Sequence, residues 1–190
     1  MNERLNTLLK LNRHRRESQH QAAIDICKDL LAKDEFDADV IAILATLYHQ
    51  VAFVRTEAIS ELFERAIFWA NKAIEITPYR ADFYAIRGRI WLDFPDYENA
   101  ASDFRSALQI RPDLLSACFG LGFLARVPEE IVSIDEAINV IKSATETHID
   151  NPLVFNELHG LLMIKGQMNE ANQALSRALL CLDPLLDKYT

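Results

Sequence analysis

The feature that most constrains the fold of this chain is a pattern of small and aromatic residues between residues 81 and 112. Residues three, four or seven positions apart share one face of a helix, so the pattern predicts two consecutive helices. The small residues let the two helices approach closely, and the aromatic side chains fill the space beside them. The pattern consists of Tyr84, Gly88 and Trp91 in the first helix and Ala100, Phe104 and Ala107 in the second, followed by Pro112.

The segment 152–183 repeats this helical hairpin with almost no departure. Its pattern positions are Phe155, Leu158, Leu162, Gly166, Ala171, Leu175 and Ala178. Asn151 and Pro152 supply an N-cap residue followed by proline at the first helical position, so a helix is expected to begin there. Gly166 marks the expected turn between the two helices.

The segment 115–151 predicts a third hairpin with a longer turn, at residues 126–133. Its first helix carries small and apolar residues at the pattern positions, and its second helix continues them three residues late. The sequence from Ser133 to Glu136 is a capping box, which predicts that the second helix begins there. Gly122 is the position at which the two helices are expected to approach each other.

The N-terminal part of the chain follows the pattern more loosely. In residues 38–80 the two halves lie about nine residues further apart than in a standard repeat. Helix-forming residues fill the gap, so we expect two extended helices, with Thr56 as the cap between them. In residues 4–37 the polar Lys10 and His14 occupy positions that are usually apolar, which suits a degenerate hairpin that caps the end of a repeat array.

Over residues 4–183 the chain resembles the tetratricopeptide-repeat family, whose period is about 34 residues. The resemblance implies an all-α fold, an α-α superhelix in the form of a right-handed solenoid of about five helix hairpins. One hairpin cannot bury its apolar face alone, so stacking forms a single repeat domain over residues 1–190. The expected hairpins are 4–37, 38–80, 81–114, 115–151 and 152–183, with a short C-terminal tail at 184–190.

The resemblance implies a non-catalytic protein–protein interaction scaffold or adaptor that binds a peptide or a partner domain. In this family the exposed side of the first helices lines a concave groove and contacts the ligand. The candidate groove residues, including flanking arginines that would suit a carboxylate, are Thr46, Gln50, Arg89, Asp93, Phe119, Phe123, Arg126 and Asn156. Phe119 and Phe123 stand four positions apart, and they either anchor a peptide side chain or pack on a neighbouring helix.

Two other functions remain open at this point. Family members that clamp the C-terminal carboxylate of chaperone peptides have, in order, Lys, Asn, Asn, Lys and Arg at the clamp positions. The matching residues of this chain are Ala42, Thr46, Ile86, Ser116 and Gly120, so that clamp is absent. A secretion-type or assembly chaperone would bind an unfolded apolar segment. A regulatory factor would contact nucleic acid through the basic run at residues 13–16.

The charge, the apolar stretches and the cysteines of the chain limit which partners and which compartment are expected. The chain has 20 basic and 28 acidic residues, and the resulting net charge of −8 argues against general binding to nucleic acid or to an anionic membrane. The apolar stretch at residues 40–54 is interrupted and too short to cross a bilayer, and no export signal is visible, so we expect a cytoplasmic protein. Cys27, Cys118 and Cys181 are far apart on apolar helix faces, which predicts reduced, buried thiols.

The sequence predicts no catalytic, cofactor-binding or metal site. The five histidines are scattered, and no nucleophile lies near a base in the sequence. The last helix carries Leu175, Leu179, Leu180 and Leu182 near its end, which leaves apolar surface open. A symmetric homodimer through the C-terminal hairpin would cover it, and so would a tail folded back over Leu182.

Overall fold

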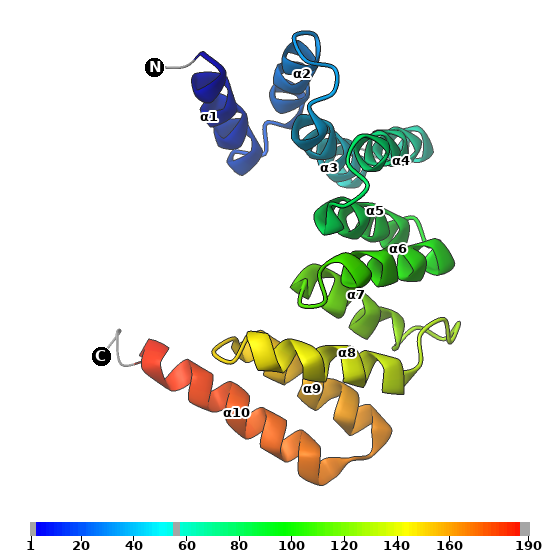
Figure 1. The fold of residues 1–190 in the computed structure, drawn as a ribbon, viewed down its shortest axis with the longest axis vertical. Helices are drawn as coiled ribbons and strands as arrows, with labels where there is room; N and C mark the ends of the chain where they lie inside the picture. Colours follow the sequence, from blue (N-terminus) through cyan, green and yellow to red (C-terminus); the bar gives the residue numbers. More distant parts are fainter. Residues whose placement is uncertain (1–2, 55–57, 187–190) are drawn as a thin grey trace. The chain divides into compact units, whose positions relative to one another are not determined.

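The structure, a computed structural model, describes residues 3–54 and 58–186, and these residues form ten helices and no strand (Figure 1). The fold class is all-α, as the sequence predicts. The helices are α1 (Glu3–Arg16), α2 (His20–Leu31), α3 (Ala38–Val54), α4 (Ile59–Ile76), α5 (Ala81–Asp93), α6 (Tyr97–Ile110), α7 (Leu115–Leu124), α8 (Ile134–Thr147), α9 (Pro152–Lys165) and α10 (Met168–Leu186).

The chain divides into two compact units. Unit 1 spans Met1–Phe94 and contains α1 to α5, and unit 2 spans Pro95–Thr190 and contains α6 to α10. Within each unit, every helix packs against the next one in sequence, and the most extensive pairs are α3 with α4 and α9 with α10. Each unit is therefore a stack of helical hairpins.

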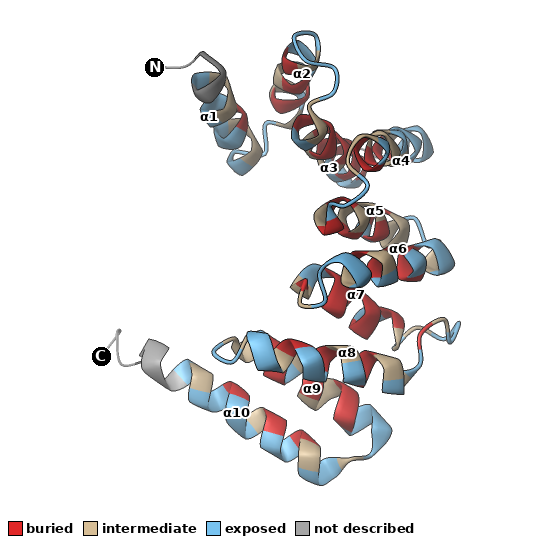
Figure 2. Ribbon diagram, viewed as in Figure 1, coloured by how far each residue is buried: buried red, intermediate tan, exposed pale blue. Residues whose placement is uncertain are grey.

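Unit 1 has its core around α3, which is buried along most of its length (Figure 2). Helices α3 and α4 have 17 and 18 residues, against 13 in α5, so the expected pair of extended helices is confirmed. Ala58 precedes α4 in the left-handed backbone conformation. The predicted cap Thr56 lies outside the described residues.

In unit 2, α8 and α9 have the caps that the sequence predicts. The hydroxyl of Ser133 accepts a hydrogen bond from the backbone N–H of Glu136, at 3.1 Å. The side chain of Asn151 accepts one from the N–H of Leu153, at 3.0 Å. Gly166 ends α9 with a φ of 80°, a left-handed conformation that glycine adopts without strain. These local predictions are confirmed.

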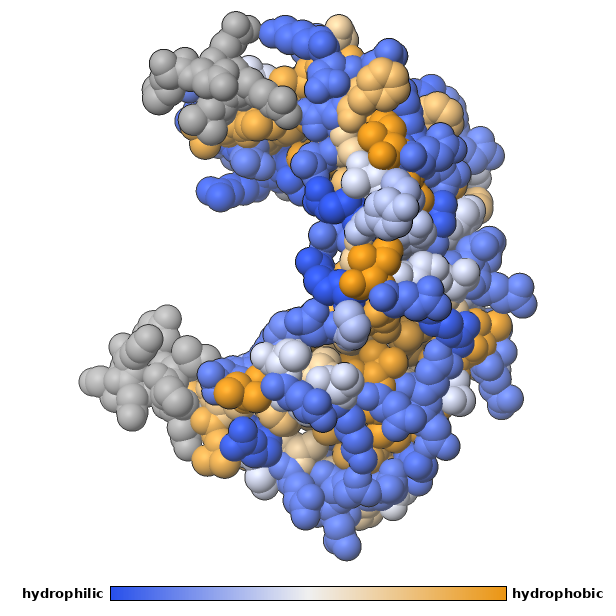
Figure 3. Space-filling view, viewed as in Figure 1, coloured by the Kyte–Doolittle hydropathy of each residue, from blue (hydrophilic) through white to orange (hydrophobic). Residues whose placement is uncertain are grey.

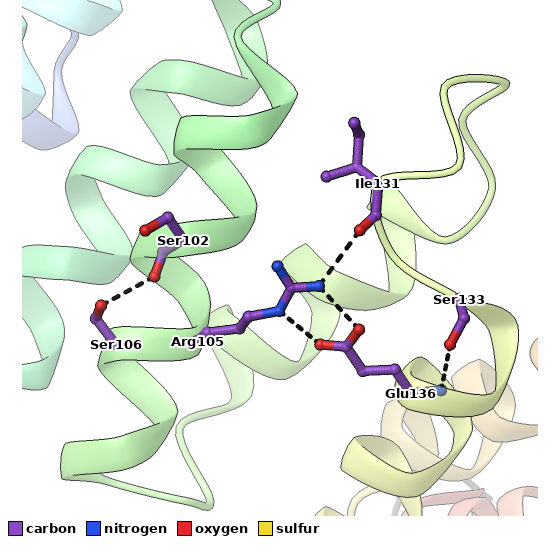
Figure 4. A network of polar contacts seen from close by, with 6 residues as sticks. All are labelled: Ser102, Arg105, Ser106, Ile131, Ser133 and Glu136. Carbon is purple, nitrogen blue, oxygen red and sulfur yellow. Dashed lines mark hydrogen bonds and ion pairs between the residues drawn. The ribbon is translucent and has the colours of Figure 1, made fainter.

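The carboxylate of Glu136 does not complete the capping box. It binds Arg105 of α6 instead, through two bonds of 2.7 and 2.8 Å from Nε and Nη2 (Figure 4). The same guanidinium donates to the carbonyl of Ile131, at 3.3 Å. Arg105 thus connects α6 to the first turn of α8 and to the loop that precedes it.

Helices α6 and α7 are in tight contact at Gly120. A Cβ atom built at Gly120 would lie 2.5 Å from Cζ of the buried Phe104 ring, so only glycine fits without a shift of the ring. A Cβ atom at Gly122 would meet the carboxylate of Glu157 in α9. The sequence assigned Gly122 to the approach of α7 and its hairpin partner α8, but the atoms nearest to Gly122 belong to Glu157 and Arg126 instead.

The last helix continues to Leu186, three residues beyond the end expected near Asp183. Leu179, Leu180 and Leu182 on this helix are exposed. The side chains from residue 183 onward are outside the described part of the structure, so the alternative of a tail folded back over Leu182 lies outside it too. Unit 2 therefore carries open leucine side chains near the end of α10.

The three cysteines differ in burial. Cys27 in unit 1 and Cys118 in unit 2 are buried, and burial raises the pKa of their thiols to about 12 and about 11, respectively. Cys181 is only partly buried, and its thiol donates to the carbonyl of Ile149. Full burial is thus confirmed for two of the three.

None of the described helices combines the length and the apolar character needed to cross a bilayer. Among the described residues, no three side chains of His, Cys, Asp or Glu lie close enough together to hold a metal ion.

Candidate functional site

The candidate residues of unit 1 lie on α3 and α5. Thr46 is half-buried, and its hydroxyl donates to the carbonyl of Ala42 within the same helix, at 3.0 Å. Gln50 is exposed one turn later. On α5, the Nε atom of Arg89 donates to Asp93 at 3.3 Å. Two of the four residues, Arg89 and Asp93, are therefore brought into contact.

A buried histidine that the sequence reasoning missed completes this polar group. Nε2 of His49 lies 2.9 Å from Oδ2 of Asp93, and His49 is 9% exposed. Burial lowers the pKa of His49 because it disfavours the imidazolium, and the nearby Asp93 carboxylate acts in the opposite direction. The two residues are 44 positions apart, so no local pattern could have paired them.

Aromatic rings surround His49. The ring of Phe53 meets it edge-on with centroids 5.2 Å apart, and the ring of Phe63 lies 5.7 Å away. Phe63 in turn stacks at a tilt on Phe94, with centroids 5.2 Å apart. Phe53 and Phe94 remain exposed. Unit 1 therefore carries an aromatic surface at the ends of α3 and α5, which is also absent from the predicted set.

The candidate residues of unit 2 centre on the predicted pair Phe119 and Phe123 in α7. Phe119 is half-buried and Phe123 is 51% exposed, whereas Cys118 and Leu121 on the other side of the same helix are buried. Phe123 is therefore not a core residue, and Phe119 is buried only in part.

Arg126 follows these rings and links α7 to α9. Its Nη1 atom donates to the carbonyl of Gly122 at 2.6 Å and pairs with Oε1 of Glu157 at 2.5 Å. A Cβ atom at Gly160 would lie 3.1 Å from Nη2, so this glycine leaves room for the guanidinium. The charge of Arg126 is thus already balanced, and a ligand carboxylate would have to compete with Glu157.

Helix α9 presents a further apolar stripe next to α7, against which it packs. Leu153 is 64% exposed and Ile164 is 56% exposed, and the predicted residue Asn156 is exposed between them. Their spacing of three and eight places all three on one helix face. We define the α7–α9 surface by its exposed and half-buried members, Phe119, Phe123, Leu153, Asn156 and Ile164. Leu153 and Ile164 were not predicted, although their helical spacing could have revealed them.

Figure 3 shows hydrophobic patches among largely hydrophilic residues on the visible face of the protein. The two histidines of unit 2 bind backbone carbonyl groups and so connect parts of the fold. A ring nitrogen of His148 donates to the carbonyl of Asp113 at 2.9 Å, and one of His159 donates to the carbonyl of Ala171 at 3.0 Å. The arrangement of the α7–α9 surface therefore suits contact with another chain: apolar anchors, one free amide and a charged pair at the edge.

Comparisons with known proteins bear on the fold. No family model matches the sequence, and no curated protein matches it. Among solved structures, MamA superposes with a TM-score of 0.72 at 18% identity, covering 93% of this chain and 96% of MamA. A thermophilic TPR protein of Thermus thermophilus, TTC0263, gives 0.67 at 18% identity, covering 96% of this chain and 93% of its own.

YrrB, described as a TPR protein with an unusual peptide-binding site, gives a TM-score of 0.61 at 16% identity, with 90% of this chain and 82% of YrrB covered. These identities are too low to carry a function from one protein to another. The three structures nevertheless share the helical-hairpin architecture along nearly the whole chain. The chain therefore has the tetratricopeptide-repeat fold that its sequence pattern predicts.

Proposed function

We propose that this protein is a non-catalytic interaction scaffold that binds a peptide or a partner domain on the α7–α9 surface of unit 2. The observation that carries the proposal is the exposure of Phe123, 51%, on a helix whose opposite side is buried. Isolated apolar side chains are ordinary on protein surfaces, but several exposed ones on two helices that pack together are typical of an interaction site.

The rest of the surface supports the same function. Large apolar side chains such as Phe123, Leu153 and Ile164 supply binding energy when a partner removes them from water. The amide of Asn156 can both donate to and accept from the backbone of a bound peptide. The Arg126–Glu157 pair forms a polar edge that would disfavour a misplaced partner more than it would strengthen binding.

The comparison with YrrB agrees with this proposal, since the same architecture holds a peptide-binding site in that protein. The residues of the α7–α9 surface differ from those of the chaperone adaptors, whose lysine and asparagine clamp is absent from this chain. We therefore expect recognition through apolar anchors rather than through a terminal carboxylate. An assembly chaperone would use the same surface but would prefer an unfolded segment.

Affinity capture with quantitative mass spectrometry tests the proposal. The double variant Phe119→Ser/Phe123→Ser should lose the proteins that the parent retains. Its melting temperature should fall only modestly, because Phe123 is exposed and Phe119 is half-buried. Phe36→Ser is the matched control, since Phe36 is an exposed phenylalanine of unit 1 and lies outside the surface. Equal retention by the parent and the double variant would refute the proposed site.

Once a partner is known, its folded state separates the two remaining functions. A scaffold should bind the native partner or a short peptide from it. A chaperone should bind the urea-unfolded partner more tightly than the native form. Titration of both forms by fluorescence anisotropy gives the answer.

A further inference from the structure

Unit 1 contains a pocket that plays no part in the α7–α9 surface. It has a volume of about 310 Å³ and lies between α4 and the end of α5. Its walls are largely aromatic, and one carboxylate stands among them. The lining side chains that the argument uses are Phe63, Glu64, Ile67, Phe68, Trp91 and Phe94.

The aromatic walls are held in place but stay open to solvent. Phe63 is buried and supports Phe94, with ring centroids 5.2 Å apart. Phe68 is 59% exposed and meets Trp69 edge-on, also at 5.2 Å. Trp91 is half-buried. A ligand can therefore reach ring surfaces whose positions are fixed by neighbouring rings.

Glu64 supplies the negative charge of the pocket. It is exposed, and it forms no ion pair with any residue that the structure describes. Arg65, the next residue in the chain, pairs with Glu61 at 2.6 Å. Arg87 donates to the neutral side chain of the lining residue Asn71 at 2.7 Å and does not itself line the pocket. The pocket thus has a negative charge available and no positive charge of its own lining it.

Aromatic faces and a carboxylate attract the same kind of ligand. The face of an aromatic ring carries a negative electrostatic potential and binds ammonium and guanidinium groups. Lys and Arg also have an apolar stem, which can lie along Ile67 and the rings while the charged end reaches Glu64. A purely apolar side chain would remove Glu64 from water without compensation, and an acidic one would be repelled. The net charge of −8 favours a basic partner as well.

We propose that this pocket binds a lysine or arginine side chain of a partner protein. The α4–α5 pocket is then a second contact point, separate from the α7–α9 surface in both location and chemistry. It recognises a positive charge, whereas the α7–α9 surface presents apolar anchors. Either site can exist without the other.

The two tryptophans of the chain make a direct test possible. In a Trp69→Phe background, the fluorescence of Trp91 alone reports on the pocket. The probes are N-acetyl-lysine amide and N-acetyl-arginine amide, and the matched neutral probe is N-acetyl-norleucine amide, which retains an apolar stem without the ammonium group. The lysine and arginine probes should give a saturable change in Trp91 fluorescence at millimolar concentration. The norleucine probe should bind more weakly, with a dissociation constant larger by about threefold at least.

Two pocket variants and one control variant test whether the probes bind at this pocket. Glu64→Gln should weaken binding of the lysine probe by about threefold, as expected for one partly solvated charge contact. Glu75→Gln removes an exposed carboxylate of the same helix that does not line the pocket, and it should leave binding unchanged. Phe68→Ala should also weaken binding, and because this ring is exposed the variant should keep its fold.

Three results would overturn the proposal. Equal binding of the norleucine and lysine probes would identify the pocket as a site for apolar side chains. Equal weakening by Glu64→Gln and Glu75→Gln would indicate general attraction to an acidic protein. No saturable response of Trp91 to either basic probe would mean that the pocket does not select a cation.

Discussion

At the scale of single residues, His49 shows how one buried side chain couples stability to pH. Its pKa is lowered from an ordinary value of 6.5, with burial as the largest cause and the Asp93 carboxylate opposing it. The folded state therefore prefers the neutral imidazole, and the unfolded chain takes up a proton first as the pH falls. This contribution to stability is present above pH 6.5 and decreases as the pH falls below it.

We predict that His49→Gln makes stability less dependent on pH between 7 and 5. Glutamine can still donate to Asp93 but carries no proton-binding ring, so this source of acid sensitivity disappears. Urea unfolding at several pH values should give a smaller loss of unfolding free energy for the variant than for the parent. Identical pH profiles would show that His49 is not a source of acid sensitivity.

Residues close together in sequence were predictable, and residues brought together by packing were not. The Ser133 cap depends on an N–H three positions away, and Gly166 depends on its own backbone, so both could be inferred from the sequence. The contact between His49 and Asp93 depends on how α5 lies on α3. The same applies to Glu136, whose predicted capping role is replaced by an ion pair with Arg105, 31 positions away.

At the scale of elements, the contact between α6 and α7 depends on the missing side chain at Gly120. Gly120→Ala should destabilise unit 2 by about 1–3 kcal/mol, because the added methyl group overlaps the buried Phe104 ring. The better helix propensity of alanine offsets only about 1 kcal/mol of this cost. Urea denaturation followed by circular dichroism measures the difference.

Gly160→Ala is the matched control for this prediction. Its methyl group would meet only the end of the Arg126 side chain, at 3.1 Å, which can move. The control should therefore be neutral or slightly stabilising, as expected for Gly→Ala inside a helix. If the two variants had equal stability, the tight α6–α7 contact would not limit the packing of this unit.

The lengths of the helices could be predicted from the sequence more readily than the surfaces that the helices form when they pack. Helix-forming residues filled the insertion between residues 38 and 80, which correctly predicted the extended α3 and α4. The pocket beside Glu64 was not predicted, because its rings come from two helices and align only after those helices pack. Leu153 and Ile164 lie on one helix, so their helical spacing in the sequence could have predicted that they share one face.

At the scale of the whole molecule, self-association through the end of α10 remains a prediction. The described side chains Leu179, Leu180 and Leu182 are exposed, so unit 2 has apolar surface available there. We expect sedimentation equilibrium to show a concentration-dependent dimer, because pairing two such surfaces removes leucine side chains from water. Leu179→Gln/Leu180→Gln should shift the protein toward the monomer.

Leu9→Gln is the control for this experiment, since Leu9 is also exposed but belongs to unit 1. It should leave the association unchanged. A parent protein that sediments as a monomer at all concentrations would contradict the prediction of a dimer.

The two buried cysteines make it possible to measure how often each unit of the chain opens. A thiolate reacts with an alkylating reagent much faster than a thiol, and Cys27 and Cys118 have pKa values of about 12 and about 11. Both residues are also 0% exposed, so we expect their modification in the folded protein to require local opening, and one lies in each unit. Mass spectrometry of the labelled peptides over time would then report whether the two halves open together or independently.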